Sequence, residues 1–170
     1  CKFVDISVLL KGAIKGEWLW NQYLSHIRDF DAILHVLRCF EDKEITHVNN
    51  IIDPISDKEI IDTELILSDL NSLEKQMNNL KKKIRTEDKE LKYQYGVMEK
   101  LYKALSDGKK INELLDINEK EKEIIKKLFL ITSKPELFVC NVSESDLVNG
   151  NNFTRELETK FSNENSKIIY

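Results

Sequence analysis

The chain has 170 residues, of which 41% are hydrophobic and 33% are charged, with a formal net charge of −4. This length allows one compact domain or two small ones. The negative charge gives no general attraction to nucleic acid or anionic membranes, and no apolar run reaches the roughly 18–20 residues that span a bilayer, so we expect a cytoplasmic protein with no membrane or DNA partner.

The first part of the chain has the pattern of alternating strands and helices. Residues 3–6 form a short apolar run that predicts a strand. Residues 21–29 predict a helix, because apolar side chains such as Leu24 and Ile27 recur at helical spacing. Residues 32–39 form a mostly apolar run of eight, which is typical of a buried parallel strand. An α/β arrangement follows from this alternation.

The middle of the chain predicts three helices. Residues 57–83 contain no glycine or proline and carry apolar side chains every three or four positions, with Asp57 as the expected N-cap. Residues 86–105 predict a second helix, and the short break between the two favours an antiparallel helical hairpin. Residues 118–129 predict a third, with Glu121 completing a capping box at its start.

The last part of the chain returns to strands. Pro135 ends helical structure, residues 136–140 predict a strand, residues 152–161 a helix and residues 167–170 a final strand. The predicted fold is therefore a partial parallel sheet with an inserted antiparallel, coiled-coil-like hairpin. We expect three regions: residues 1–56 and 131–170 from the sheet domain, and residues 57–130 as the helical insertion.

Polar residues at two predicted strand ends are candidates for ligand binding. Asp5 ends the first strand and precedes a loop rich in lysine and glycine, which suits an anion, although a solvated loop is an equal alternative. Asn141 and Glu144 follow the strand at 136–140, where an amide and a carboxylate could recognise the edge of a purine. A simple turn after the strand is the alternative. Lysines around position 82 form either a solvated face or a contact with an RNA-rich surface.

Several segments together resemble the Obg-like ATPase family, also called YchF, within the P-loop GTPase superfamily. They are FVDI at 3–6, LLKGAIKGE at 9–17, HVLRCFED at 35–42, DTELILSDL at 62–70 and LFLITSKPELFVCNVSE at 128–144. The resemblance runs along essentially the whole chain. It implies a G-domain with a helical insertion, binding of ATP with Mg²⁺, and association with the ribosome. It also implies a preference for ATP over GTP, because the base-reading motif is NVSE rather than NKxD.

The resemblance also implies two sets of site residues. These are the nucleotide-binding residues Asn141, Val142 and Glu144, and the switch II residues Asp5, Val8, Leu9 and Gly12. Asp5 would contact Mg²⁺ through water. Leu9 stands where Ras-like enzymes carry a catalytic glutamine, and an aliphatic side chain cannot orient water by hydrogen bonding. Val8, Trp18 and Trp20 stand where the family has glycine, which adds bulk to a segment that approaches the phosphate.

The phosphate-binding loop of the family does not occur in these residues. We therefore expect an internal fragment of a ribosome-associated protein that binds and hydrolyses ATP, with no confident catalytic residue of its own. The fragment alone is expected to be inactive and to bind no cofactor tightly. The alternative function is a non-catalytic module, built on the helical hairpin, that binds a protein or the ribosome.

Overall fold

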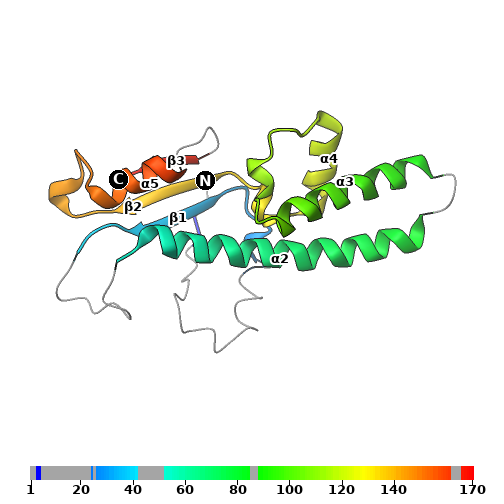
Figure 1. The fold of residues 1–170 in the computed structure, drawn as a ribbon, viewed down its shortest axis with the longest axis horizontal. Coiled ribbons are helices and arrows are strands. Elements are labelled where there is room, and N and C mark those ends of the chain that lie inside the picture. Colours follow the sequence, from blue (N-terminus) through cyan, green and yellow to red (C-terminus); the bar gives the residue numbers. More distant parts are fainter. Residues whose placement is uncertain (1–2, 5–23, 25, 42–51, 85–87, 162–165) are drawn as a thin grey trace, which may run out of the picture. The chain divides into compact units, whose positions relative to one another are not determined.

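A computed structural model describes residues 3–4, 24, 26–41, 52–84, 88–161 and 166–170. The elements in chain order are β1 (Ile33–Arg38), α2 (Pro54–Lys83), α3 (Lys89–Ser106), η1 (Ile111–Glu113), α4 (Glu119–Leu128), η2 (Ile131–Ser133), β2 (Glu136–Asn141), η3 (Glu144–Asp146), α5 (Asn152–Phe161) and β3 (Ser166–Ile169), as Figure 1 shows. The contacts divide the chain into two compact units. The sheet unit comprises Cys1–Glu59 with Glu136–Tyr170, and the helical unit comprises Ile60–Pro135. In the part of the chain so described, no helix is long and apolar enough to cross a membrane.

The sheet unit contains three parallel strands in the order β1-β2-β3. The register places Leu37 opposite Cys140, and Phe138 opposite both His35 and Ile168. One face of the sheet is buried beneath α5, which contributes Leu157 to the shared core. The α/β class and the parallel pairing of the strands predicted at 32–39 and 136–140 are therefore confirmed.

The opposite face of the sheet carries exposed aliphatic side chains. On β1, Leu34 is 43% and Val36 is 65% exposed, and on β3 Ile169 is 49% exposed. Because Val36 pairs with Val139 and Val139 pairs with Ile169, these side chains form a continuous row across the strands. Among the described residues this row is left exposed, whereas most parallel sheets are covered on both faces.

The strand predicted at residues 3–6 is not formed at residues 3 and 4, the two of the four that the structure describes. Phe3 and Val4 are exposed and belong to no strand, while residues 5 and 6 lie outside the described residues. Of the helix predicted at 21–29, Leu24, His26 and Ile27 are helical and the residues before Leu24 are not described.

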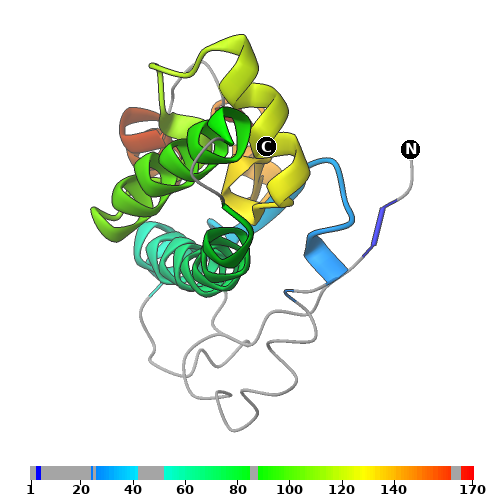
Figure 2. The ribbon, with the colours of Figure 1, turned by 90° about the vertical axis from the view of Figure 1, so that its right-hand side faces the viewer.

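The helical unit has its own core. Side chains from α2, α3 and α4 meet in one apolar cluster that includes Leu73, Met98, Leu101 and Ile125. Figure 2 looks along this group of helices, in which α2 and α3 lie next to each other. A bundle of this kind is held by the burial of one apolar stripe from each helix.

The capping residues explain where the helices begin and correct one prediction. Asp53 accepts a hydrogen bond from the Ser56 amide at 2.9 Å, so α2 begins at Pro54 and Asp57 lies in its first turn rather than at its N-cap. Proline is well suited to the first helical position because its missing N–H would have no partner there. The capping box predicted for α4 is confirmed, with Asn118 and Glu121 each accepting from the other's amide.

A buried carboxylate joins α2 to the segment before β2. Asp69 is fully buried, and its Oδ1 accepts a hydrogen bond from the Ile131 amide at 3.0 Å. Its Oδ2 accepts from the Thr132 amide at 2.7 Å and from the Thr132 hydroxyl at 2.8 Å. The two amides belong to the first turn of η2, so Asp69 satisfies donors that the short helix itself leaves unpaired.

The two cysteines that the structure describes are free thiols in the sheet core. Cys39 and Cys140 are 0% and 2% exposed. The contact between them raises the pKa of Cys39, and burial acts in the same direction. These residues fit the role of small apolar core residues in neighbouring strands.

Candidate functional site

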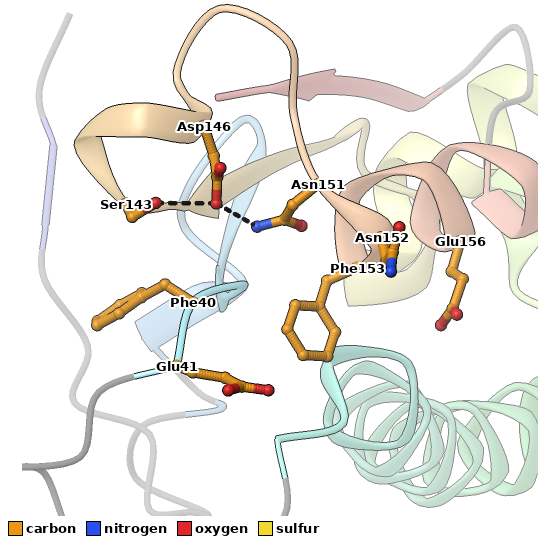
Figure 3. Close-up of a pocket in the computed structure, with 8 residues that line it drawn as sticks. All are labelled: Phe40, Glu41, Ser143, Asp146, Asn151, Asn152, Phe153 and Glu156. Atoms are coloured by element: carbon orange, nitrogen blue, oxygen red, sulfur yellow. Dashed lines mark hydrogen bonds between the residues drawn. The ribbon is translucent and has the colours of Figure 1, made fainter.

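A pocket of about 540 Å³ opens at the carboxyl ends of β1 and β2 (Figure 3). It is lined by Phe40, Glu41, Ser143, Asp146, Asn151, Asn152, Phe153 and Glu156. Phe40 and Glu41 follow β1, Ser143 follows β2, and the remaining residues come from η3, the loop after it and the first turns of α5. The carboxyl ends of parallel strands are where α/β proteins usually bind ligands.

A hydrogen-bonded chain of side chains forms one wall of this pocket (Figure 3). Asp146 Oδ2 accepts hydrogen bonds from Asn151 Nδ2 at 3.0 Å and from Ser143 Oγ at 2.8 Å. Asn151 Nδ2 also donates to the Cys39 carbonyl at 2.6 Å, which ties the loop to the end of β1. The bonds from Asn151 and Ser143 lower the pKa of Asp146, so this carboxylate is ionised at neutral pH.

The turn into α5 holds Asn151 in place. Gly150 has a φ of +63°, and its amide donates to the Asp146 carbonyl at 2.8 Å. A Cβ on Gly150 would lie 2.5 Å from Thr154 Oγ1, so the position excludes a side chain both by conformation and by space. Asn151 and Thr154 cap each other, with each amide donating to the other's side-chain oxygen at 2.8 and 3.2 Å. The polar wall is thus built on a rigid turn.

Phe40 contributes an aromatic ring whose position is fixed by β1. The guanidinium carbon of Arg38 lies 4.9 Å from the centroid of the Phe40 ring, and Arg38 Nε donates to the Phe40 carbonyl at 3.3 Å. A cation stacked on an aromatic ring stabilises the ring's orientation. Phe153 adds a second aromatic ring to the lining.

The charge of the pocket favours ligands that donate hydrogen bonds. Among the described residues, its lining includes the acidic residues Glu41, Asp146 and Glu156 and contains no lysine or arginine. Carboxylates accept hydrogen bonds and repel phosphate, so the pocket suits amino or imino groups presented by a planar ligand.

The residues predicted to read a base lie beside this pocket without lining it. Asn141 is the last residue of β2, with an exposed side chain and a carbonyl that accepts from the Cys39 amide at 2.8 Å. Val142 packs partly against the sheet core, and Glu144 is exposed as the first residue of η3. Ser143, within the same motif, does line the pocket. The predicted switch II residues Asp5, Val8, Leu9 and Gly12 lie outside the described residues.

Phe40, Asp146 and Asn151, which line the pocket, were not among the site residues predicted from the sequence. Asp146 and Asn151 belong to the polar run SDLVNGNN, which follows the motif predicted to read the base and contains the turn-prone Asn149-Gly150 pair. This run offered a signal for a structured loop. Phe40 offered none, because one aromatic residue after an apolar run is equally typical of a core.

Comparison with known proteins gives consistent matches. The chain is 39% identical over 170 residues to the "Ribosome-binding ATPase YchF" of Bacillus subtilis, covering 99% of this chain and 46% of that protein. It is 45% identical over 148 residues to the protein of the same name from Mycoplasma pneumoniae, covering 87% of this chain and 40% of that protein. The solved structure of the Schizosaccharomyces pombe YchF GTPase matches with a TM-score of 0.76 and 34% identity, covering 88% of this chain and 42% of that one. The chain thus spans less than half the length of these relatives. No protein-family model matches the chain.

Proposed function

We propose, from the premise that this chain is a segment of the YchF, or Obg-like, ATPase family, that it forms the base-reading part of an ATP site. The protein to which it corresponds would bind and hydrolyse ATP with Mg²⁺ and associate with ribosomes in the cytoplasm. Relatives named as ribosome-binding ATPases support this proposal. The helical unit would be the antiparallel, coiled-coil-like insertion of the family.

The acidic pocket at the carboxyl ends of β1 and β2 is the observation that carries the proposal. Adenine presents an N6 amino group, which donates hydrogen bonds, and a flat face that can stack on an aromatic ring. The carboxylates supply acceptors and Phe40 supplies a ring. Since no basic residue lines the pocket within the described part of the chain, the proposal has the phosphates lie elsewhere. In this proposal Asn141, Val142 and Glu144 form the rim that distinguishes adenine from guanine.

The other residues implied by the family complete the proposal. Asp5 would hold Mg²⁺ through water, and Val8, Leu9 and Gly12 would belong to switch II. Mg²⁺ would neutralise phosphate charge when bound, and carboxylate oxygens are ligands that it accepts. Since phosphates carry most of the charge recognised in such sites, we expect these 170 residues alone to bind ATP no more tightly than about 1 mM. Calorimetry that gave micromolar binding would contradict this expectation.

A chimera tests base recognition. The chain would replace the matching segment of the Bacillus subtilis relative, and ATP and GTP would compete for a fluorescent nucleotide. Glu144→Asp should shift the preference toward GTP by about 1–3 kcal/mol, because the shorter carboxylate matches the one that NKxD GTPases use. Glu99→Asp, an exposed change on α3, is the matched control. An unchanged ratio for Glu144→Asp would contradict the assignment.

The same chimera tests the substituted switch. Val8, Trp18 and Trp20 add side chains where the family has glycine, and a valine hinders close approach of the backbone to phosphate. We expect the variant Val8→Gly, Trp18→Gly, Trp20→Gly to hydrolyse ATP faster in a single turnover than the parent chimera. Equal rates would mean that the three side chains are compatible with catalysis.

The alternative function is a non-catalytic module that binds a protein or the ribosome through the helical unit. The separate core of that unit favours this possibility, because it allows the helices to present a surface independently of nucleotide. Sedimentation of the chimera with ribosomes at equal strength with and without ATP, together with no hydrolysis, would support the alternative.

A further inference from the structure

Two carboxylates that line the pocket at the strand ends are not used within the described part of the chain. Glu41 follows β1 and Glu156 lies on α5, and both side chains are exposed. Neither forms a hydrogen bond or an ion pair with another described residue. By contrast, Glu158 on the same helix accepts a hydrogen bond from the Tyr170 hydroxyl. The sequence at 41–44, EDKE, is net acidic as well, so Glu41 lies in a negatively charged stretch.

The described cations next to the lining residues in sequence are engaged elsewhere. The Arg38 guanidinium lies against the Phe40 ring, and its Nε donates to the Phe40 carbonyl. Arg155 Nη1 donates to Asn152 Oδ1 at 3.2 Å. Lys160, further along α5, pairs with a glutamate of α2. The pocket carboxylates therefore face a ligand with their own charge, among the residues that the structure describes.

An aromatic ring lies between these two carboxylates. Figure 3 shows the Phe153 ring between the carboxylates of Glu41 and Glu156, in the pocket of about 540 Å³. Phe153 is half-buried, because it also packs against the core of the sheet unit. A cation within about 6 Å of such a ring's centroid is attracted to its face. The third carboxylate, Asp146, is held by hydrogen bonds within the pocket wall and adds to the negative charge.

A guanidinium group matches the ring and the carboxylates together. It is planar and always charged, and its five N–H donors form a rigid fork in the plane of the group. It can stack on an aromatic face while its edges donate to carboxylates on either side. An ammonium group lacks the flat face and is more strongly hydrated, and an anion would be repelled.

The turn beside the pocket exposes two aliphatic side chains. Leu147 and Val148 are 51% and 86% exposed, and they lie in sequence between the lining residues Asp146 and Asn151. The turn is rigid, because Gly150 has a φ of +63° and its amide donates to the Asp146 carbonyl. Apolar side chains on a preorganised turn favour contact with another polypeptide. They indicate that the guanidinium belongs to a protein partner rather than to a small molecule.

We propose that this pocket binds an arginine side chain of a partner polypeptide when no nucleotide occupies it. The guanidinium lies on Phe153 and donates to Glu41 and Glu156. Apolar residues of the partner beside the arginine contact Leu147 and Val148. Because the same pocket is proposed to read the base of ATP, arginine and nucleotide exclude each other. The inference goes beyond the proposed function, since it concerns the nucleotide-free pocket and requires no base to bind there.

Calorimetric titration of the 170-residue chain with a short peptide tests the proposal. The probe is the terminally blocked peptide Ser-Leu-Ser-Arg-Ser-Leu-Ser. Two further peptides replace its arginine with lysine or with citrulline, which has a similar shape and no charge. We expect the arginine peptide to bind about two- to fivefold more tightly than the lysine peptide and at least about tenfold more tightly than the citrulline peptide. Equal binding of the citrulline peptide, or no binding of the arginine peptide, would overturn the proposal.

Substitution of the two free carboxylates locates the binding. Glu41→Gln, Glu156→Gln should weaken the arginine peptide by about 4- to 25-fold, since each exposed ion pair contributes about two- to fivefold. The matched control is Glu119→Gln, Glu123→Gln, which removes the same charge from exposed positions of α4. It should change the affinity by less than about twofold, because distant charges are screened. Circular dichroism would verify that both variants fold, and equal losses for the two pairs would contradict the assignment.

Agmatine, a free alkylguanidinium, separates a small-molecule ligand from a polypeptide. We expect agmatine to bind more weakly than the arginine peptide, because it cannot reach the aliphatic side chains of the turn. Leu147→Ser, Val148→Ser should weaken the peptide by about threefold or more and leave agmatine within about twofold of the parent value. Agmatine that binds as tightly as the peptide, or a peptide unaffected by the double substitution, would contradict a polypeptide partner.

Competition in the Bacillus subtilis chimera separates this inference from the proposed function. The arginine peptide should raise the apparent dissociation constant for ATP, about doubling it when the peptide concentration equals the peptide's own dissociation constant. An ATP affinity that is unchanged at saturating peptide would overturn the shared pocket. A chimera that binds no ATP would contradict the proposed function, while titration of the 170-residue chain with the peptides still decides whether the pocket binds arginine.

Discussion

Removal of the Asp69 carboxylate should severely destabilise the helical unit. Asp69 accepts three hydrogen bonds at 2.7–3.0 Å from Ile131 and Thr132 while fully buried. In Asp69→Ala these three donors would lose their partner, and each unsatisfied buried donor costs about 1–3 kcal/mol. Because water can enter the space vacated by the carboxylate, we expect a total loss of about 3–5 kcal/mol rather than the full sum.

Urea unfolding followed by circular dichroism would measure this loss. Thr132→Val removes only the hydroxyl donor and should cost about 1–2 kcal/mol. The exposed Asp116→Ala is the control for removing a carboxylate and should cost less than about 0.5 kcal/mol. Hydrogen exchange would measure directly how strongly the Ile131 and Thr132 amides are protected from solvent in each variant. If Asp69→Ala lost less than about 1 kcal/mol and these amides kept their protection, the argument that Asp69 anchors η2 would be wrong.

Three further predictions concern the sheet unit. Gly150→Ala should lower the free energy of unfolding by about 1–3 kcal/mol in a urea titration, because the new methyl group meets Thr154 Oγ1 at a positive φ. Lys58 and Glu136 are both almost fully buried, and Lys58 Nζ lies 3.9 Å from Glu136 Oε2. Lys58→Met should therefore lower the free energy of unfolding by about 3–5 kcal/mol, because it leaves the Glu136 carboxylate without this cation. Adding Glu136→Gln should recover part of the loss, as thermal unfolding of the single and double variants would measure. The pKa of Asp146 in the folded protein is lowered below its ordinary value of 3.8. The ionised carboxylate therefore stabilises the fold fully above the pKa of the unfolded chain, and this stabilisation is lost as the pH falls through the folded pKa. The free energies of unfolding of the parent and of Asp146→Asn, measured against pH, should converge in acid.

Local signals in the sequence predicted most of the elements. The capping box of α4 was predictable because Asn118 and Glu121 are three residues apart. The N-cap of α2 was predicted four residues too late, since Asp57 has the same capping chemistry as Asp53, which accepts the hydrogen bond from the Ser56 amide. Both aspartates satisfy the local rules for an N-cap, so the sequence alone did not distinguish them.

Long-range contacts limited what could be predicted about the site. Asn151 bonds to the carbonyl of Cys39, which is 112 residues away, and no local pattern links these two positions. The strand end carrying Asn141 was predictable from the apolar run before it, whereas the Phe40 side of the pocket depends on the pairing of β1 with β2. Fold class follows from periodicity, but the composition of a pocket requires the register of the sheet.

The exposed aliphatic row on the sheet has a practical consequence for work with this chain. The exposed side chains of this row are Leu34, Val36 and Ile169. Together they form an apolar surface that a second molecule could cover. Association of this kind stabilises the folded form by mass action, so an apparent melting temperature would rise with protein concentration. Self-association through this row would make the unfolding and binding curves of these 170 residues depend on protein concentration, so each curve should be measured at more than one concentration.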